Sequence, residues 1–461
     1  MTFKTFCICI TTLAASLFSI EPFVVNLREQ GAAGDGITDD QPSITKAASS
    51  IAATGGTLYF PKGTYRCARQ NSACDGIYFK DATNINIIFD AGTVLLMDNL
   101  SPENGKGDRG HGIHFEGACR NIVISNVTVR WKTRASSRSK GDGFNFFGYP
   151  GDAKSIANVR MINCRAEQCP QTGAVLMGCS DVTVDYFHVE NNLADGLHFN
   201  ACRRVHVKNH TGISNGDDTL AFVTYYDENG ITNHYTGGPY VLPSLGEWNN
   251  SGSDAENITA IGGRANGIRI SGASNVSISN VRVDGKSSGI ICDSGRKDGS
   301  RFSWTYLASR GIHINGLYAR RVNTGFFVWN FNEPLIGDER FWRYGITAND
   351  ITAVDCGNDG MHLFRCAGVT VSNVLSVNRR IRVATAQQCT LDTVNVSNAS
   401  LGFYANDLTK PDKAGLSAND ITVSGGDIIV DRYKNVTLTN ITINGKKLST
   451  DECAMLGKMP K

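Results

Sequence analysis

The chain has 461 residues and a formal net charge of +2, with 45 Lys and Arg against 43 Asp and Glu. This balance gives no electrostatic reason to expect binding to nucleic acid or to a membrane surface. Only 19% of the residues are charged and 49 are Gly. Such a composition suits a solenoid, which can be this long without dividing into domains because it grows by stacking similar coils.

The N-terminus is typical of a secretory signal. Lys4 supplies a positive charge, and residues 6–20 form an apolar segment that is too short and too interrupted to span a membrane. We therefore expect residues 1–22 to be a signal peptide and the mature protein to be secreted or periplasmic. No later stretch is apolar enough to span, so no membrane partner is expected.

Fourteen Cys are present, and twelve lie beyond the predicted signal. An even number in an exported protein predicts disulfides. No two Cys have C-x-x-C spacing, so a zinc site is disfavoured and no metal is expected. Nucleotide, haem and flavin motifs are also missing from the sequence, which predicts no cofactor. The Cys pairs closest in sequence are Cys67 with Cys74 and Cys164 with Cys169.

Residues 23–83 are expected to form an N-terminal cap and the first coils. The run Gly34–Asp40 leads into a helical pattern that ends near Ala53, with Asp39 or Asp40 as the N-cap. A strand and a turn follow in residues 55–65. The Asp cluster could instead bind calcium, but a helix that covers the open end of a solenoid is the simpler interpretation.

From residue 84 to residue 461, short apolar and polar ladders recur, most of them with Gly at the same place. Several successive Gly are 22 or 23 residues apart, which gives the length of one coil. Within each ladder, alternate residues form an inward core column and an outward column. The ladders begin at Asp142, Thr172, Ala194, Gly216, Asn266, Ser288, Thr324 and Asp359.

One ladder, Gly216-Asp217-Asp218, carries a second carboxylate where Gly is expected. Asp195 and Asp217 would occupy equivalent places 22 residues apart, and stacked strands lie roughly 4.8 Å apart. We therefore expect Asp195, Asp217 and Asp218 to cluster. Repulsion would raise the pKa of at least one, and a protonated acid beside an ionised base suits glycoside hydrolysis. The alternative is a structural Asp and Asn turn ladder, as at Asp142.

The outward column around these Asp residues supplies candidate substrate contacts. His198, Asn200 and Arg269 are expected on the same surface as the Asp cluster. Further along, the outward aromatic residue Trp329 could stack on a sugar ring or simply pack beneath a loop. The irregular stretch from Tyr225 to Asp254 predicts a long loop over one face, of the kind that is often functional.

The Asp motifs resemble a known family. Ala194-Asp195-Gly196, then Gly216-Asp217-Asp218, then Gly267-Ile268-Arg269-Ile270 are similar to the N-T-D, G/Q-D-D and R-I-K motifs of polygalacturonases, glycoside hydrolase family 28. Residues 34–65 resemble the cap of the broader pectate-lyase-like superfamily, which includes rhamnogalacturonases and epimerase-like proteins.

The resemblance implies an all-β, right-handed parallel β-helix with an N-terminal helical cap. It also implies inverting hydrolysis with Asp218 as the general acid, and Asp195 and Asp217 as the pair that activates water.

Two departures from the family pattern bear on the substrate. No G-H-G motif follows the Asp pair, and only His234 has a comparable spacing. The R-I-K motif reads Arg269-Ile270-Ser271, so the lysine of the pair that the family links to the uronate carboxylate is missing. Arg269 alone can still bind a carboxylate, but the loss argues against ordinary polygalacturonate.

Three functions remain open, each with a polysaccharide partner and an expected monomer. The first is a glycoside hydrolase acting on a possibly acidic, pectin-like glycan. The second is a polysaccharide lyase or uronate epimerase, with His198 or His234 as the base and Arg269 neutralising the carboxylate. The third is a non-catalytic glycan-binding β-helix. An inverting pair predicts that Asp195 and Asp218 lie roughly 6.5–9.5 Å apart.

Overall fold

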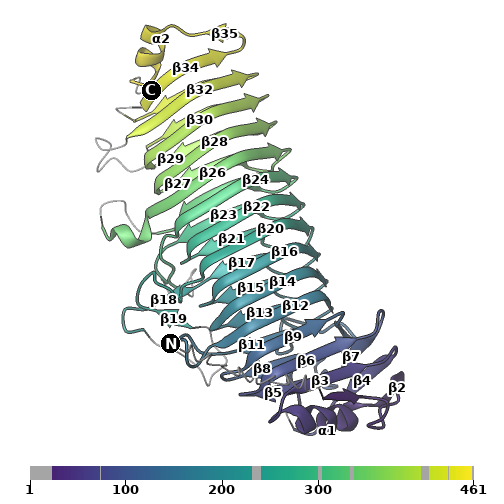
Figure 1. Cartoon of the computed structure of the whole chain (residues 1–461). Coiled ribbons are helices and arrows are strands. Elements are labelled where there is room, and N and C mark those ends of the chain that lie inside the picture. The colour runs from purple at the N-terminus through teal and green to yellow at the C-terminus, as the bar shows by residue number, and fades with distance from the viewer. Residues whose placement is uncertain are drawn as a thin grey trace, which may run out of the picture.

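The computed structural model describes residues 23–72, 74–230, 240–298, 304–332, 337–405, 415–433 and 436–458. Over these ranges the chain winds into one stack of β-coils with a helix at each end (Figure 1). Nearly all the strand pairs are parallel, and each strand pairs with its counterpart in the next coil. The predicted parallel β-helix is confirmed. Neither helix in the described part is long and apolar enough to cross a membrane.

One wall of the stack is a 13-stranded parallel sheet, called sheet B here, built from the predicted ladders. Its strands are β5 (Ile77–Lys80), β8 (Ile113–Glu116), β11 (Phe144–Phe147), β13 (Ala174–Met177), β15 (Leu197–Asn200), β17 (Leu220–Val223), β21 (Asn266–Ser271), β23 (Ser288–Ser294), β25 (Thr324–Asn330), β27 (Asp359–Phe364), β29 (Ile381–Ala384), β31 (Leu401–Tyr404) and β33 (Ile428–Asp431).

The remaining walls belong to a 20-stranded assembly, called sheet A. Its strands are β1 (Val24–Asn26), β2 (Asp35–Asp39), β3 (Gly56–Phe60), β4 (Thr64–Ala68), β6 (Thr83–Phe89), β7 (Val94–Asp98), β9 (Arg120–Ser125), β10 (Thr128–Trp131), β12 (Ile156–Glu167), β14 (Cys179–Glu190), β16 (Arg203–Ile213), β20 (Ser251–Ile261), β22 (Ser274–Asp284), β24 (Arg310–Arg320), β26 (Arg343–Val354), β28 (Ala367–Val377), β30 (Gln387–Ser397), β32 (Leu416–Ser424), β34 (Val436–Ile443) and β35 (Lys446–Lys447).

The remaining elements lie at the ends of the stack and in the loops beside sheet B. Helix α1 (Gln41–Ile51) covers the N-terminal coil with five buried side chains, as predicted. Asp40 is its N-cap by position, but its carboxylate accepts hydrogen bonds from Ala33 and Gly34 instead of the helix. Helix α2 (Thr450–Leu456) packs beside β34. The others are β18 (Tyr225–Tyr226), β19 (Val241–Leu242) and η1 (Glu339–Phe341).

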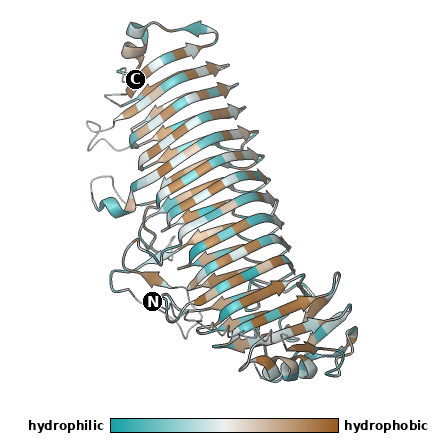
Figure 2. Cartoon of the chain, viewed as in Figure 1, coloured by the Kyte–Doolittle hydropathy of each residue, from teal (hydrophilic) through white to brown (hydrophobic). Residues whose placement is uncertain are grey.

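The interior is filled by side chains of like kind stacked from coil to coil. The rings of Phe79, Phe115 and Phe146 form one such stack, with centroids 5.4 Å apart at each step. Apolar and polar residues alternate along the strands, as the banding in Figure 2 shows. The inward residues are buried throughout, so the coils are held together by a continuous apolar core.

The recurring Gly is explained by how closely successive coils approach. A Cβ at Gly173 would lie 2.6 Å from the carbonyl oxygen of Gly196, and one at Gly267 would lie 2.5 Å from that of Gly289. These separations are shorter than any normal contact of a Cβ atom. At these two positions only Gly therefore lets the chain enter the strand of sheet B at this spacing.

The Asp ladder differs from the prediction by one residue. Gly173 N donates to Asp195 O, Gly196 N to Asp218 O and Thr219 N to Asn266 O. Thr219, not Asp218, therefore replaces the recurring Gly, and Asp218, not Asp217, is the counterpart of Asp195.

A one-residue shift exchanges the two faces of a strand. Leu220 and Phe222, which an alignment of the ladders by their Asp residues places in the outward column, are consequently core residues with no exposed surface.

The disulfide prediction is wrong for this structure. All twelve Cys beyond the predicted signal are free thiols, and eleven of them are buried. They serve as small apolar residues of the core, stacked between coils in two places, where Cys179 neighbours Cys202 and Cys366 neighbours Cys389. The predicted signal, residues 1–22, lies outside the described residues.

Candidate functional site

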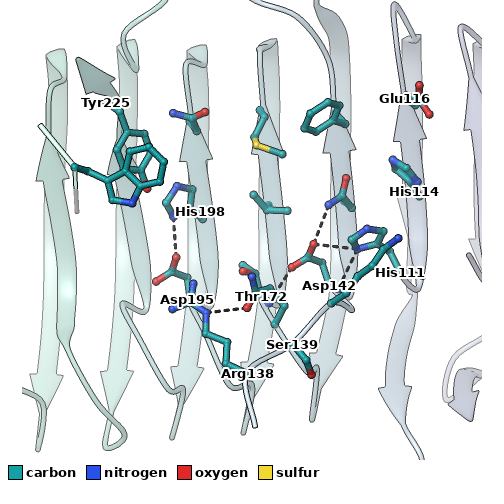
Figure 3. Close-up of a pocket in the computed structure, with 18 residues that line it drawn as sticks. His111, His114, Glu116, Arg138, Ser139, Asp142, Thr172, Asp195, His198 and Tyr225 are labelled. Atoms are coloured by element: carbon teal, nitrogen blue, oxygen red, sulfur yellow. Dashed lines mark hydrogen bonds and ion pairs between the residues drawn. The ribbon is translucent and has the colours of Figure 1, made fainter. Parts of the chain in front are cut away.

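The outward face of sheet B carries two neighbouring hollows. The larger, of about 880 Å³, lies over β8, β11, β13 and β15 and is called the N-terminal hollow here. The smaller, of about 520 Å³, lies over β21, β23 and β25 and is called the C-terminal hollow. The indole of Trp304 borders both, and the Asp cluster lies at the junction. Figure 3 shows the N-terminal hollow and its ionisable residues.

Three coils of the stack use one carboxylate oxygen in the same way. Oδ1 of Asp142 accepts the backbone N–H of Thr172, Oδ1 of Asp195 accepts that of Asp218, and Oδ1 of Asp218 accepts that of Asn266. The structural alternative, a turn ladder, therefore exists, and Asp195 and Asp218 both belong to it. The chemistry must come from the other oxygen, Oδ2.

The partner of Oδ2 is set by the residue three positions later. Asn145 donates to Asp142 Oδ2 at 2.8 Å, and His198 Nδ1 lies 2.8 Å from Asp195 Oδ2 (Figure 3). After Asp218 the equivalent residue is Ala221, which has no polar group. Asp218 is 3% exposed, and no hydrogen bond to its Oδ2 occurs among the described residues.

These partners give the carboxyls of Asp195 and Asp218 different pKa values. Burial alone would raise the pKa of Asp195, but the hydrogen bond and charge of His198 bring it below its ordinary value. Burial, followed by the charges of Asp217 and Asp195, raises the pKa of Asp218 to about 7. Asn266 donates twice to Oδ1 of Asp218, so a proton on this carboxyl resides on Oδ2. A protonated acid thus lies beside an ionised carboxylate.

Asp217 completes the cluster from the turn before β17. Burial and the charge of Asp195 raise the pKa of Asp217, while Arg138 Nη1 lies 2.8 Å from its Oδ2. One oxygen from each of Asp195, Asp217 and Asp218 lies within 4.8 Å of the others. This is tighter than the 6.5–9.5 Å expected of an inverting pair. It is also the one described group of acidic, His and Cys side chains close enough to share a metal ion.

Lys286, which the sequence analysis did not single out, lies behind the cluster. Its side chain is buried, and its Nζ donates to the backbone carbonyl of Asp217 at 2.9 Å. Burial lowers the pKa of Lys286 to about 8, and the three carboxylates oppose that effect. The turn that positions Asp217 is therefore held by an ammonium group. No local motif marks Lys286, because it meets Asp217 only through coil stacking.

Arg269 lies on the outward surface, as predicted, but its guanidinium already forms an ion pair within the protein. Its Nε and Nη2 donate to the two oxygens of Asp293, at 3.0 and 2.6 Å. Its guanidinium carbon lies 4.8 Å from the ring centroid of Tyr306. Ser271, which stands in the place of the missing lysine, donates to the same Asp293 carboxylate. The sequence analysis did not identify Asp293. The pattern that could have identified it is its position in the outward column, one coil after Ser271.

The other predicted contacts have different outcomes. His198 faces the N-terminal hollow and Trp329 the C-terminal one. Asn200 is fully buried, and its side chain bonds both backbone groups of Tyr240 and the carbonyl of Val223. Asn200 therefore anchors the predicted loop from within the lining of the N-terminal hollow. His234 lies outside the described residues.

A second group of ionisable residues occupies the far end of the N-terminal hollow. His114 Nδ1 lies 2.8 Å from Asp75 Oδ2, and His111 Nδ1 lies 3.0 Å from Asp142 Oδ2. The two imidazole rings are 5.2 Å apart (Figure 3). Sequence reasoning missed this group because Asp75 and His114 are 39 residues apart and meet only in neighbouring coils.

The fold recurs in other proteins. Mannuronan C5-epimerase AlgE1 of Azotobacter vinelandii is 46% identical over 142 residues, which is 30% of this chain and only 10% of that relative. The A-module of AlgE6 from the same organism is a structural neighbour, with a TM-score of 0.53, 16% identity and coverage of 91% of this chain and 98% of the module.

A further neighbour is the pre-mature gene product 12 of bacteriophage phi29, with a TM-score of 0.58, 16% identity and coverage of 92% and 53%. Residues 24–291, more than half of the chain, match the model of the family described as rhamnogalacturonase A/epimerase, pectate lyase-like. The chain therefore belongs to the rhamnogalacturonase A/epimerase family of pectate-lyase-like proteins.

Proposed function

We propose that the protein is a glycoside hydrolase that cleaves a polysaccharide at the Asp195, Asp217 and Asp218 cluster. The observation that carries this proposal is the missing partner of Asp218 Oδ2. With no donor at Oδ2 among the described residues to offset them, burial and the charges of Asp217 and Asp195 raise the pKa of Asp218 to about 7 beside the ionised Asp195, which is the pairing that glycosidic bond cleavage requires. The apolar N-terminal segment favours a substrate outside the cytoplasm.

In this mechanism Asp218 protonates the leaving glycosidic oxygen from Oδ2. Asp195 and Asp217 then orient and deprotonate the attacking water. Oxygens that lie within 4.8 Å of one another can share one water, because two hydrogen bonds of about 2.8 Å meeting at a bent angle span such a distance. Carboxyls about 5–5.5 Å apart are typical of retaining enzymes. Because the cluster is this tight, a measurement has to decide between inversion and retention at the anomeric carbon.

The test is a turnover assay of the mature protein and of Asp218→Asn on homogalacturonan, rhamnogalacturonan, mannuronan and a neutral glucan. Reducing ends and ultraviolet-absorbing unsaturated products are followed in parallel, with and without a chelator. Reducing ends without unsaturation, lost in Asp218→Asn, support hydrolysis. Proton nuclear magnetic resonance of the first product gives its anomeric configuration. The proposal fails if no polymer releases reducing ends.

A second candidate is lyase or epimerase chemistry at His111 and His114. Two imidazoles that are each oriented by a carboxylate can act as bases toward an acidic C–H next to a uronate carboxylate. The family description and the AlgE1 relative also name epimerases. In the same assay, unsaturated or epimerised products that are lost in His114→Ala but kept in Asp218→Asn would favour it. Binding without any turnover would leave a glycan-binding role.

A further inference from the structure

The two hollows differ in how they can receive a negative charge. In the N-terminal hollow, Lys140 belongs to the lining and has no ion pair among the described residues, whereas His111, His114 and His198 are each paired with an Asp. In the C-terminal hollow the cation is Arg269, which gives its Nε–Nη2 edge to the carboxylate of Asp293. A glycan that crosses the Asp cluster therefore meets two different electrostatic surfaces.

Asp293 is the reason for this difference. Bidentate binding by an Arg uses two parallel N–H donors, and the Nε–Nη2 edge of Arg269 already gives both to Asp293. Tyr306 covers the face of the guanidinium, and Ser271 donates to the same carboxylate. A uronate at this place would compete with a carboxylate that is part of the protein and would be repelled by its charge.

The rest of the C-terminal hollow suits a sugar without a charge. Ile291, Phe327, Trp304 and Trp329 contribute apolar and aromatic surface, and Ser287 and Ser288 contribute hydroxyl groups. Aromatic side chains present wide apolar faces, and the C–H-rich face of a pyranose ring can pack against such a surface. The described lining of the C-terminal hollow therefore provides apolar contacts and hydrogen-bonding groups, but its cation is already paired.

We propose that Asp293 is a specificity-determining residue that makes the C-terminal hollow select a neutral sugar. Acidic sugars of the same chain are then confined to the side of the cluster where Lys140 lies. The inference rests on the proposed function only in treating the two hollows as one glycan site. It goes beyond that function by assigning a substrate class to each side of the cleavage point.

The test measures binding, so that it does not depend on turnover. Calorimetric titrations use the Asp218→Asn protein with two probes, an oligogalacturonate and the same oligomer with every carboxyl reduced to an alcohol. Adding Asp293→Asn frees the Arg269 fork, and we expect about tenfold tighter binding of the oligogalacturonate, the scale of one charge-assisted hydrogen bond. Binding of the reduced oligomer should stay within about twofold.

Two controls separate charge from shape. Lys140→Met, in the other hollow, should weaken the oligogalacturonate and leave the reduced oligomer unchanged. The double variant Arg269→Met with Asp293→Leu removes both charges together and should give no gain for the oligogalacturonate. The inference is overturned if Asp293→Asn leaves the ratio of the two affinities unchanged, or if neither probe binds.

A measurement on the Asp218→Asn protein alone covers the case in which Asp293→Asn does not fold. Oligogalacturonates are prepared with the carboxyl reduced only at the reducing end or only at the other end. One of these should bind more tightly than the fully acidic oligomer, because its neutral sugar fits over Arg269. If neither does, the inference is wrong. Wild-type turnover of the same oligomers tests the proposed hydrolysis separately.

Discussion

At the scale of single residues, the site arises from a missing partner rather than from an added group. Asp142, Asp195 and Asp218 all support the turn ladder through Oδ1. They differ in whether Asn145, His198 or Ala221 faces Oδ2. The same backbone position thus carries a carboxylate with a partner at Oδ2 in Asp142 and Asp195, where His111 with Asn145, or His198, lowers the pKa, and a protonated acid in Asp218.

Replacing Asp218 by Asn should lower kcat by about 10²–10⁴, the usual contribution of a general acid, with little change in KM. The pKa of about 7 also sets the sign of the pH dependence. The acid works when protonated, so wild-type activity should fall as the pH rises through about 7. The pH–rate profile of both proteins checks this, with Asp254→Asn on sheet A as the control. An unchanged kcat in Asp218→Asn would show that Asp218 is not the general acid.

Replacing His198 by Ala should move the acidic limb of the profile to higher pH. His198 is what lowers the pKa of Asp195 against the effect of burial, so without it Asp195 takes up a proton at a higher pH and stops acting as a base. The exposed His313 on β24 supplies the matched control, His313→Ala. An acidic limb that stays in place in His198→Ala would show that Asp195 is not the group titrating there.

At the scale of elements, the recurring Gly and the hydrogen-bond register place the carboxylates. Each coil must enter sheet B close against the carbonyl of the next, and in the fourth ladder Thr219 holds the position that Gly holds elsewhere. Aligning the ladders by their Asp residues misplaces that coil by one. Backbone hydrogen bonds, not residue likeness, decide which carboxylates are equivalent.

Gly267→Ala should lower the free energy of unfolding by about 1–3 kcal/mol, the usual cost of forcing an extra methyl group into a packed region. The added Cβ would lie 2.5 Å from the Gly289 carbonyl oxygen and 2.4 Å from a methyl of Val283. Gly246→Ala is the control, because a Cβ there meets nothing within 4 Å. Thermal or denaturant unfolding compares the two, and equal stability would contradict the close-approach explanation.

At the scale of the whole molecule, stability comes from one continuous core without cross-links. The twelve Cys beyond the predicted signal are free, and burial raises the pKa of several of the thiols, Cys292 among them. A protonated thiol that is shielded from solvent is a poor nucleophile. The even Cys count, which predicted disulfides, here reflects small apolar residues repeated with the coils.

In the native protein the eleven buried thiols should therefore react slowly with a thiol reagent and the partly exposed Cys74 faster, and the protein unfolded in denaturant should expose all twelve thiols beyond the predicted signal. A reducing agent should leave the melting temperature unchanged, because no bond is available to break. Mass spectrometry after alkylation counts the thiols. A melting temperature that drops on reduction would restore the disulfide prediction.

The sequence by itself determined the solenoid, because the coil period and the alternation of apolar residues are local patterns that core burial requires. It also identified Asp195, Asp217, Asp218 and Arg269, since carboxylate motifs and an outward Arg are visible along the chain. Only the tertiary structure decided what surrounds them. The partners of Asp217 and Arg269, which are Lys286 and Asp293, lie 69 and 24 residues away. Stacking of coils brings these partners together, so that Lys286 holds the turn of Asp217 and Asp293 neutralises the cation of the C-terminal hollow.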